Sequence, residues 1–168
     1  VVINENEDKI DLFTDTMDNY LVNLSKNVET DADNQRINAF MQTSTNFERI
    51  GDHAINVLEA SQAISAGKIY FSETAKEELA LIEEAVFEIA DITMESFKTL
   101  DVDEARRIEP LEEVIDDMVL TLKNRHVERL KKGGCTTAAG IVFMDIITNL
   151  ERVADQCSNC LLYTSDAA

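Results

Sequence analysis

Eight acidic residues of this chain are spaced in a way that suits metal binding. They form four pairs, and in each pair a glutamate is followed four residues later by an aspartate. On a helix, this spacing places both carboxylates on one face, about one turn apart. Oxygen-rich groups of this kind suit hard or borderline cations such as Mg²⁺, Mn²⁺, Ca²⁺ and iron. The residues are Glu7, Asp11, Glu48, Asp52, Glu112, Asp116, Glu151 and Asp155.

The acidic pairs belong to an internal repeat. Residues 45–56 (TNFERIGDHAIN) and residues 148–159 (TNLERVADQCSN) are identical at six of twelve positions, and most of the shared residues are polar. Core packing alone would repeat apolar residues instead, so the match indicates a shared role for the polar groups. The segment EDKID, which holds the first acidic pair, matches EEVID, which holds the third, at an offset of 105.

The turns between the expected helices place the two acidic pairs of each hairpin at the same height along the helix axes. In an antiparallel hairpin, residues equidistant from the turn lie side by side. Glu112 and Asp155 are equally far from the glycines at 133–134, as are the other two acidic residues of the second copy. The four carboxylates of the first copy are centred in the same way on the polar segment 27–33. We therefore expect two groups of four carboxylates, each spanning a pair of helices about 8–10 Å apart.

Two other interpretations compete with a metal site. The carboxylates also fit solvated helix faces that form ion pairs with nearby cations, here Lys9, Arg49 and Arg152. A ferritin-like di-iron enzyme is disfavoured, because it requires Glu-x-x-His on two helices, and Gly51 and Ala154 stand where these histidines would be. The chain shows no nucleophile–base pair and no glycine-rich phosphate loop, so we do not expect an enzyme.

Long amphipathic helices must position these residues. Apolar residues make up 45% of the chain and there is one proline, a composition that predicts an all-α fold of antiparallel helical bundles. Apolar spacing predicts five long helices, over residues 5–28, 33–65, 72–100, 101–132 and 136–161. Ser72 and Gly67 are the expected helix caps, and Pro110 predicts a kink or a short preceding turn. The expected core stripe of the first helix is Ile10, Phe13, Met17, Leu21, Leu24 and Val28.

The repeat divides the chain into two parts. We predict an incomplete first repeat of two helices over 1–67 and a complete repeat of three helices over 68–162. Residues 163–168 break the helical pattern, and we interpret them as a tail translated from sequencing-adapter DNA, outside the fold. The third helix has no counterpart in the first repeat, so we expect that bundle to lack its first helix and the chain, which does not begin with methionine, to be a fragment.

The charge of the chain limits its partners. With 33 acidic and 15 basic residues, the net charge is −18, which argues against nucleic acid as a partner. No stretch approaches the roughly 18 consecutive apolar residues of a membrane span. One basic cluster, near the end of the fourth helix, either complements the helix dipole or faces anionic lipid or an acidic partner. It consists of Lys123, Arg125, Arg129, Lys131 and Lys132.

The two ERxxD segments, each followed by an asparagine four residues later, resemble the PhoU family, as do the Glu-x-x-Ile-Asp segments of the preceding helices. The stretch from residue 126 to 159 is most similar to the PhoU-like cytoplasmic region of the bacterial sodium/phosphate cotransporter family. The resemblance implies two three-helix bundles, with the first helix of the first bundle missing. It also implies metal clusters of iron, zinc, manganese or magnesium, held by the eight carboxylates named above. Ala154 and Gln156 depart from the Gly51 and His53 of the first copy.

The function implied by the resemblance is regulatory. The chain would form the cytoplasmic metal-binding domain of a sodium-dependent phosphate transporter, on the cytoplasmic side of the inner membrane. Its partners would be the transmembrane portion of the same chain and a second copy in a homodimer. The alternatives are a free-standing PhoU regulator of phosphate uptake and a structural helical spacer that binds no ligand.

Overall fold

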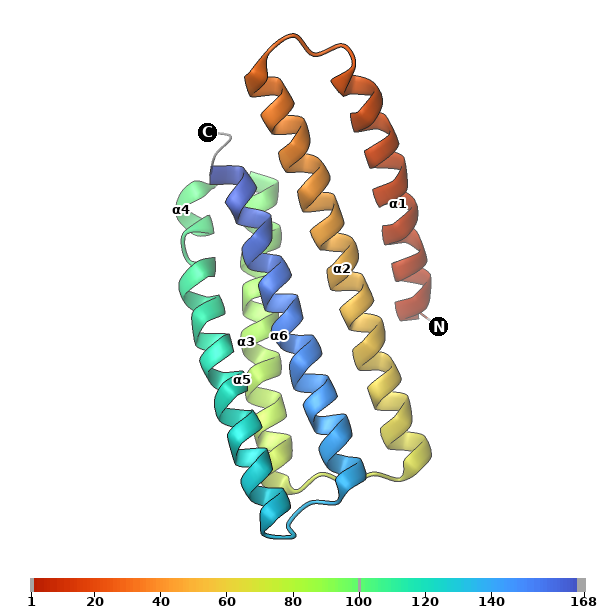
Figure 1. The fold of residues 1–168 in the computed structure, drawn as a ribbon, viewed down its shortest axis with the longest axis vertical. Coiled ribbons are helices and arrows are strands. Elements are labelled where there is room, and N and C mark those ends of the chain that lie inside the picture. Colours follow the sequence, from red (N-terminus) through yellow and green to blue (C-terminus); the bar gives the residue numbers. More distant parts are fainter. Residues whose placement is uncertain (1, 100, 166–168) are drawn as a thin grey trace.

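A computed structural model describes residues 2–99 and 101–165, and the regular structure in these ranges is α-helical (Figure 1). The all-α prediction with five long helices is confirmed, and one additional helix has only four residues. The helices are α1 (Val2–Ser25), α2 (Asp31–Gly67), α3 (Glu73–Thr99), α4 (Val102–Ala105), α5 (Ile108–Lys131) and α6 (Thr137–Ser165). Along the described residues, no helix combines the length and apolarity needed to cross a membrane.

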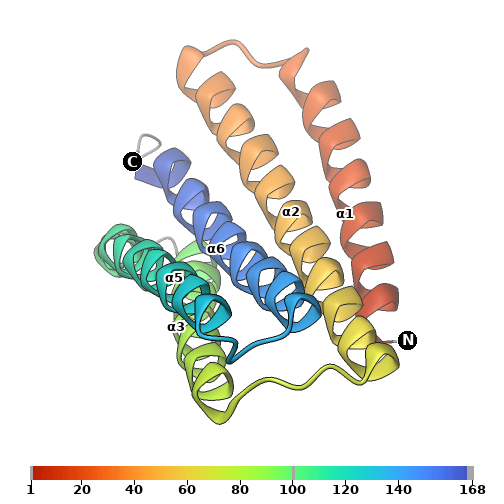
Figure 2. The same cartoon turned by 60° about the horizontal axis from the view of Figure 1, so that its bottom comes forward.

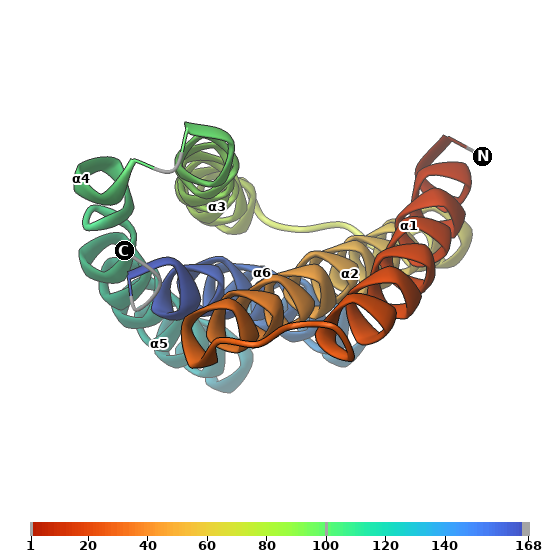
Figure 3. The same ribbon diagram turned by 90° about the horizontal axis from the view of Figure 1, so that it is seen from above.

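Four of the long helices stand in one curved row. Seen from above, the order across the row is α1, α2, α6 and α5, and α3 lies on one side of the row, where it packs on α5 and α6 (Figure 3). Figure 2 shows that the connection from α2 to α3 and the turn from α5 to α6 lie at the same end of the molecule. Helices α2 and α6, which carry the two copies of the ERxxD segment, therefore lie side by side in the centre.

The helix boundaries follow local capping. The Thr30 hydroxyl accepts a hydrogen bond from the backbone N–H of Asp33 at 3.1 Å, so α2 begins two residues earlier than predicted. The predicted N-cap is confirmed, since the Ser72 hydroxyl accepts from the N–H of Ala75 at 3.2 Å. At the end of α2, Lys68 rather than the predicted Gly67 adopts the left-handed conformation, with φ of 47°.

Pro110 does not kink a continuous helix. The predicted fourth helix is divided into α4 and α5, which begins at Ile108 and has Pro110 in its first turn. A backbone N–H in the first turn has no partner within the helix, so proline is tolerated there. The short preceding turn allowed by the prediction is the form observed. At the other end of the chain, α6 continues to Ser165 and includes part of the predicted tail, while 166–168 lie outside the described residues.

The apolar core lies between α3, α5 and α6. Ile89, Ile115 and Ile147 have no exposed surface, and Phe143 is 1% exposed. The α1 helix packs on α2, but its apolar stripe is only partly covered. Phe13, which was predicted to be in the core, is 70% exposed. The reason is geometric, since one neighbouring helix covers a narrower arc of α1 than the predicted stripe occupies.

A polar contact fixes α2 against α6. The side-chain oxygen of Asn149 accepts a hydrogen bond from the Asn56 amide at 3.0 Å and lies 3.0 Å from Nδ1 of His53. Asn149 is buried and also donates to the backbone oxygen of Asp145 at 3.0 Å. These hydrogen bonds within the protein replace hydrogen bonds to water that the side chains lose when the helices pack. The contact uses Asn149 and Asn56, two residues of the repeated segments.

Four of the five residues of the predicted basic cluster form ion pairs with three carboxylates. Glu78 of α3 is buried and forms ion pairs with Arg125 and Arg129 of α5. The other two ion pairs join Lys123 to Glu151 and Lys131 to Glu128. The buried pair ties α3 to α5, because removing one partner would leave an uncompensated charge inside the bundle. Contact of the cluster with a membrane surface stays a prediction.

We expect His126 to make the fold sensitive to mild acid. The side chain is 2% exposed and stacks on Phe143 with ring centroids 5.1 Å apart, while its Nε2 has no hydrogen-bond partner. Burial lowers the pKa of His126, and the neighbouring Arg129 lowers it further, although Glu78 opposes the shift. The unfolded imidazole, with a pKa of about 6.5, therefore takes up a proton before the folded one does.

The contribution of His126 to the free energy of unfolding should accordingly fall as the pH is lowered from 7 to 5. In urea titrations, the free energy of unfolding of His126→Leu relative to wild type should therefore rise over this range, by up to about 1 kcal/mol. Val119→Ala is a suitable control, because it removes core volume from the same helix and leaves the histidine in place. Equal pH dependence in wild type and His126→Leu would contradict the assignment.

Candidate metal centre

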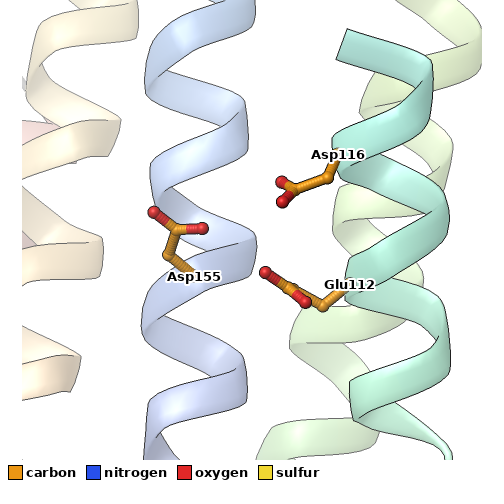
Figure 4. A group of neighbouring side chains, drawn as sticks. All are labelled: Glu112, Asp116 and Asp155. Atoms are coloured by element: carbon orange, nitrogen blue, oxygen red, sulfur yellow. The ribbon is translucent and has the colours of Figure 1, made fainter. Parts of the chain in front are cut away.

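Three of the predicted carboxylates converge between α5 and α6. Glu112 and Asp116 project from α5 toward Asp155 of α6 (Figure 4), and one oxygen from each lies within 4.8 Å of the others. Within the part of the chain that the structure describes, this is the one group of three or more potential metal ligands with such spacing. A single cation placed among these oxygens would bridge the two helices, and the all-carboxylate donor set suits a hard or borderline ion.

Buried apolar neighbours position the three carboxylates. Ile115, which precedes Asp116, and Ala154, which precedes Asp155, have no exposed surface and belong to the core. Since successive residues of a helix project about 100° apart, a buried residue leaves the next one at the edge of the interface. The core thus places Asp116 and Asp155 at the rim of the contact between α5 and α6, where water and ions can reach them.

The electrostatics of the group favour a cation or a proton. Burial raises the pKa of Asp155, Asp116 raises it further, and Arg152, which approaches Asp155 at 3.4 Å, opposes the shift. Burial also raises the pKa of Glu112, with added contributions from Asp116 and Asp155. Glu112 and Asp155 are therefore harder to ionise than isolated carboxyl groups, and a bound cation would relieve this cost.

The fourth carboxylate of the second copy is engaged elsewhere. Glu151 forms an ion pair with Lys123 of α5, with 2.7 Å between Oε2 and Nζ, and both side chains are partly buried. The structure thus gathers three of the four acidic residues and pairs the fourth with an ammonium group. Lys123 is the residue that sequence reasoning missed in this role. Its position seven residues after Asp116, on the same face of α5, is the signal that could have found it.

The acidic residues of the first copy lie near one another in a looser group. A Cβ atom on Gly51 of α2 would lie 3.9 Å from Cγ of Glu7, which places Glu7 directly over this glycine. Partial burial raises the pKa of Glu7, and Asp11, Asp8 and Asp52 raise it further. The pKa of Glu48 is also raised, by burial and by carboxylates that include Asp52 and Asp11. In the described structure their oxygens do not meet the 4.8 Å spacing of the second copy, and ligation by all eight residues stays a prediction.

Two cysteines of the second repeat are buried in the core. Cys157 and Cys160 have 0% and 2% of their surface exposed. Burial raises the pKa of Cys157 to about 11, and burial together with the neighbouring Cys157 raises that of Cys160 to about 12. Since a thiolate is the form that binds metal or reacts, their environment favours a packing role over a redox or zinc site.

The sequence model of the PhoU domain matches residues 2–61 and 79–164, and the chain belongs to this family. It is 32% identical over 119 residues to the phosphate-specific transport system accessory protein PhoU homolog 1 of Thermotoga maritima, which covers 71% of this chain and 50% of that relative. The chain thus spans half the length of this curated relative.

Two solved structures share the fold. The crystal structure of PhoU from Pseudomonas aeruginosa superimposes with a TM-score of 0.89 and 19% identity over 98% of this chain and 78% of that one. The phosphate transport system regulatory protein PhoU from Streptococcus pneumoniae gives a TM-score of 0.85 and 19% identity over 99% and 77% of the two chains. At this level of identity the likeness concerns the arrangement of helices, and the all-α fold agrees with the family assignment.

Removing one charge from the carboxylate group should stabilise the metal-free protein. At pH 7, Glu112→Gln should raise the free energy of unfolding by a few tenths of a kcal/mol, because it relieves like-charge repulsion. Asp117→Asn is the matched control, since it removes one exposed charge from the same helix outside the group. Because the folded-state pKa of Glu112 is raised, the advantage should shrink as the pH falls toward 5 and the wild-type carboxyl takes up a proton. A gain no larger than that of Asp117→Asn would argue against repulsion within the group.

Proposed function

We propose that this chain is a metal-binding regulator of phosphate transport. The observation that carries the proposal is the convergence of Glu112, Asp116 and Asp155 at a repeated acidic motif within a PhoU-family fold. The named relatives support the phosphate connection, since their names refer to a phosphate-specific or phosphate transport system. The regulator would respond to phosphate or metal status through the occupancy of this site.

A free-standing regulator is the better-supported form of the proposal. The curated relative and both solved structures bear the names of PhoU proteins and not of transporters. In this form the chain works on the cytoplasmic side of the membrane, with a membrane-embedded phosphate transporter and a second copy of itself as partners. The cytoplasmic domain of a sodium-dependent phosphate transporter is the second form, and a ligand-free helical spacer is the third.

The cation would act as a cross-link between two helices. Glu112 and Asp116 would hold it from α5 and Asp155 from α6, while the metal supplies positive charge at the point where the carboxylates repel. The residues fit this role, because their oxygens already lie within 4.8 Å of one another before any ion is bound. Binding would therefore stabilise the α5–α6 contact, and protonation of the ligands would oppose it.

The first experiment measures metal binding by the chain alone. Mn²⁺ titrated into metal-free protein should raise the melting temperature and bind with a dissociation constant that increases as the pH falls from 7 to 5. The triple change Glu112→Gln, Asp116→Asn and Asp155→Asn should abolish the response and leave helicity intact, whereas Asp117→Asn should preserve it. A melting curve of the wild-type chain that ignores both Mn²⁺ and chelator would favour the spacer.

The second experiment tests regulation in cells. In a bacterium whose own PhoU gene has been deleted, the chain should restore the dependence of phosphate uptake on external phosphate, and the triple variant should not. Equal expression of both proteins must be verified by immunoblotting. A chain that binds Mn²⁺ but leaves phosphate uptake unchanged would retain the metal site and overturn the phosphate assignment.

A further inference from the structure

Lys123 occupies a position that controls the fourth carboxylate of the metal group. On α5 it follows Glu112 and Asp116 along the same face, with the buried Val119 between, and its side chain reaches across to α6. Nζ lies 2.7 Å from Oε2 of Glu151, and the two side chains are 30% and 25% exposed. At this degree of burial the pair is partly shielded from solvent, so its geometry is better defined than that of an exposed pair.

The ion pair withdraws Glu151 from the metal group. Glu151 and Asp155 are four residues apart on α6, so their side chains share a face, and Glu151 would otherwise be adjacent to the three converging carboxylates. Its oxygens are absent from the group in the described structure, where Lys123 is its partner. A metal ion that used Oε2 of Glu151 as a ligand would therefore have to displace the ammonium group of Lys123.

We propose that the ammonium group of Lys123 is a counter-ion built into the fold. It limits the metal site of the second repeat, which we call the second site, to three carboxylates and lowers the affinity of this site for divalent cations. The inference rests on the proposed metal-binding function. Two physical effects act in the same direction. The positive charge of the ammonium opposes the approach of a cation, and the ammonium engages Oε2 of Glu151 in an ion pair that a metal ion would have to displace.

The first copy lacks this counter-ion. The acidic pairs of α1 and α5 align at an offset of 105 residues. At this offset, the residue of the first copy that corresponds to Lys123 is Asp18. One oxygen of Asp18 is buried without a hydrogen-bond partner. A lysine in one copy and an aspartate in the other therefore make the two acidic groups unequal in charge.

The test compares two lysine variants of the full chain. Lys123→Met removes the ammonium and keeps the apolar length of the side chain, while Lys131→Met removes the same charge from the exposed end of α5. By Mn²⁺ calorimetry at fixed ionic strength, Lys123→Met should lower the dissociation constant of the second site about tenfold. Lys131→Met should change it by less than about twofold, because its distance and exposure screen its charge. Lys123→Gln serves as a second variant if circular dichroism shows that Lys123→Met loses helicity.

A double-mutant cycle tests whether Glu151 becomes a ligand. Glu151→Gln should weaken Mn²⁺ binding at least about fivefold more in the Lys123→Met background than in wild type. The metal-free Lys123→Met protein should also melt at a lower temperature than wild type and gain more on addition of Mn²⁺. If wild type binds Mn²⁺ and both lysine variants have the same dissociation constant, the proposed role of Lys123 is overturned while the metal site is retained. Absence of Mn²⁺ binding in wild type and in Lys123→Met would overturn the metal site together with it.

Discussion

Apolar packing behind the carboxylates holds like charges together that would otherwise separate. Ile115 and Ala154 are completely buried, and each is adjacent in sequence to one of the converging aspartates. The free energy of burying this core is large compared with the repulsion of a few carboxylates at its rim. The position of the acidic group, its raised pKa values and its readiness for a cation all depend on this imbalance. A weaker core would let α5 and α6 separate at the acidic rim.

The two copies of the acidic motif lie on comparable pairs of helices and differ in charge. The shared residues include Asn56 and its counterpart Asn159, yet Asn56 bonds across to Asn149 of the other copy. The central pair of helices, α2 and α6, therefore joins the copies through the residues that define the repeat. The acidic groups, by contrast, lie on the outer sides of this pair, toward α1 and α5. A difference between the copies on these outer helices, such as Lys123 on α5 and Asp18 at the equivalent position on α1, leaves the contact between α2 and α6 unaffected.

Much of the fold and part of the site could be predicted from sequence, and the limits have physical causes. Turn positions and helical periodicity are local properties, so the five long helices and the approach of Glu112 to Asp155 followed from them. The partner of Glu151 depends on how far a flexible lysine reaches across a helix interface, which periodicity does not encode. The exposure of Phe13 depends on how many helices surround α1. The cap at Lys68 replaced the expected glycine because a single left-handed residue is tolerated where its N–H bonds back to Ile64.

The two buried thiols of the second repeat are protected from alkylation and oxidation. With a pKa of about 11, the Cys157 thiol is ionised in roughly one molecule in ten thousand at pH 7, and with a pKa of about 12 the Cys160 thiol is ionised still less. Alkylating agents and peroxides attack the thiolate, so they must wait until α6 moves away from its neighbours. The half-buried Cys135, in the turn before α6, has no comparable cover. Oxidation of the cysteines would therefore begin at a turn and reach those of α6 only after the helices have opened.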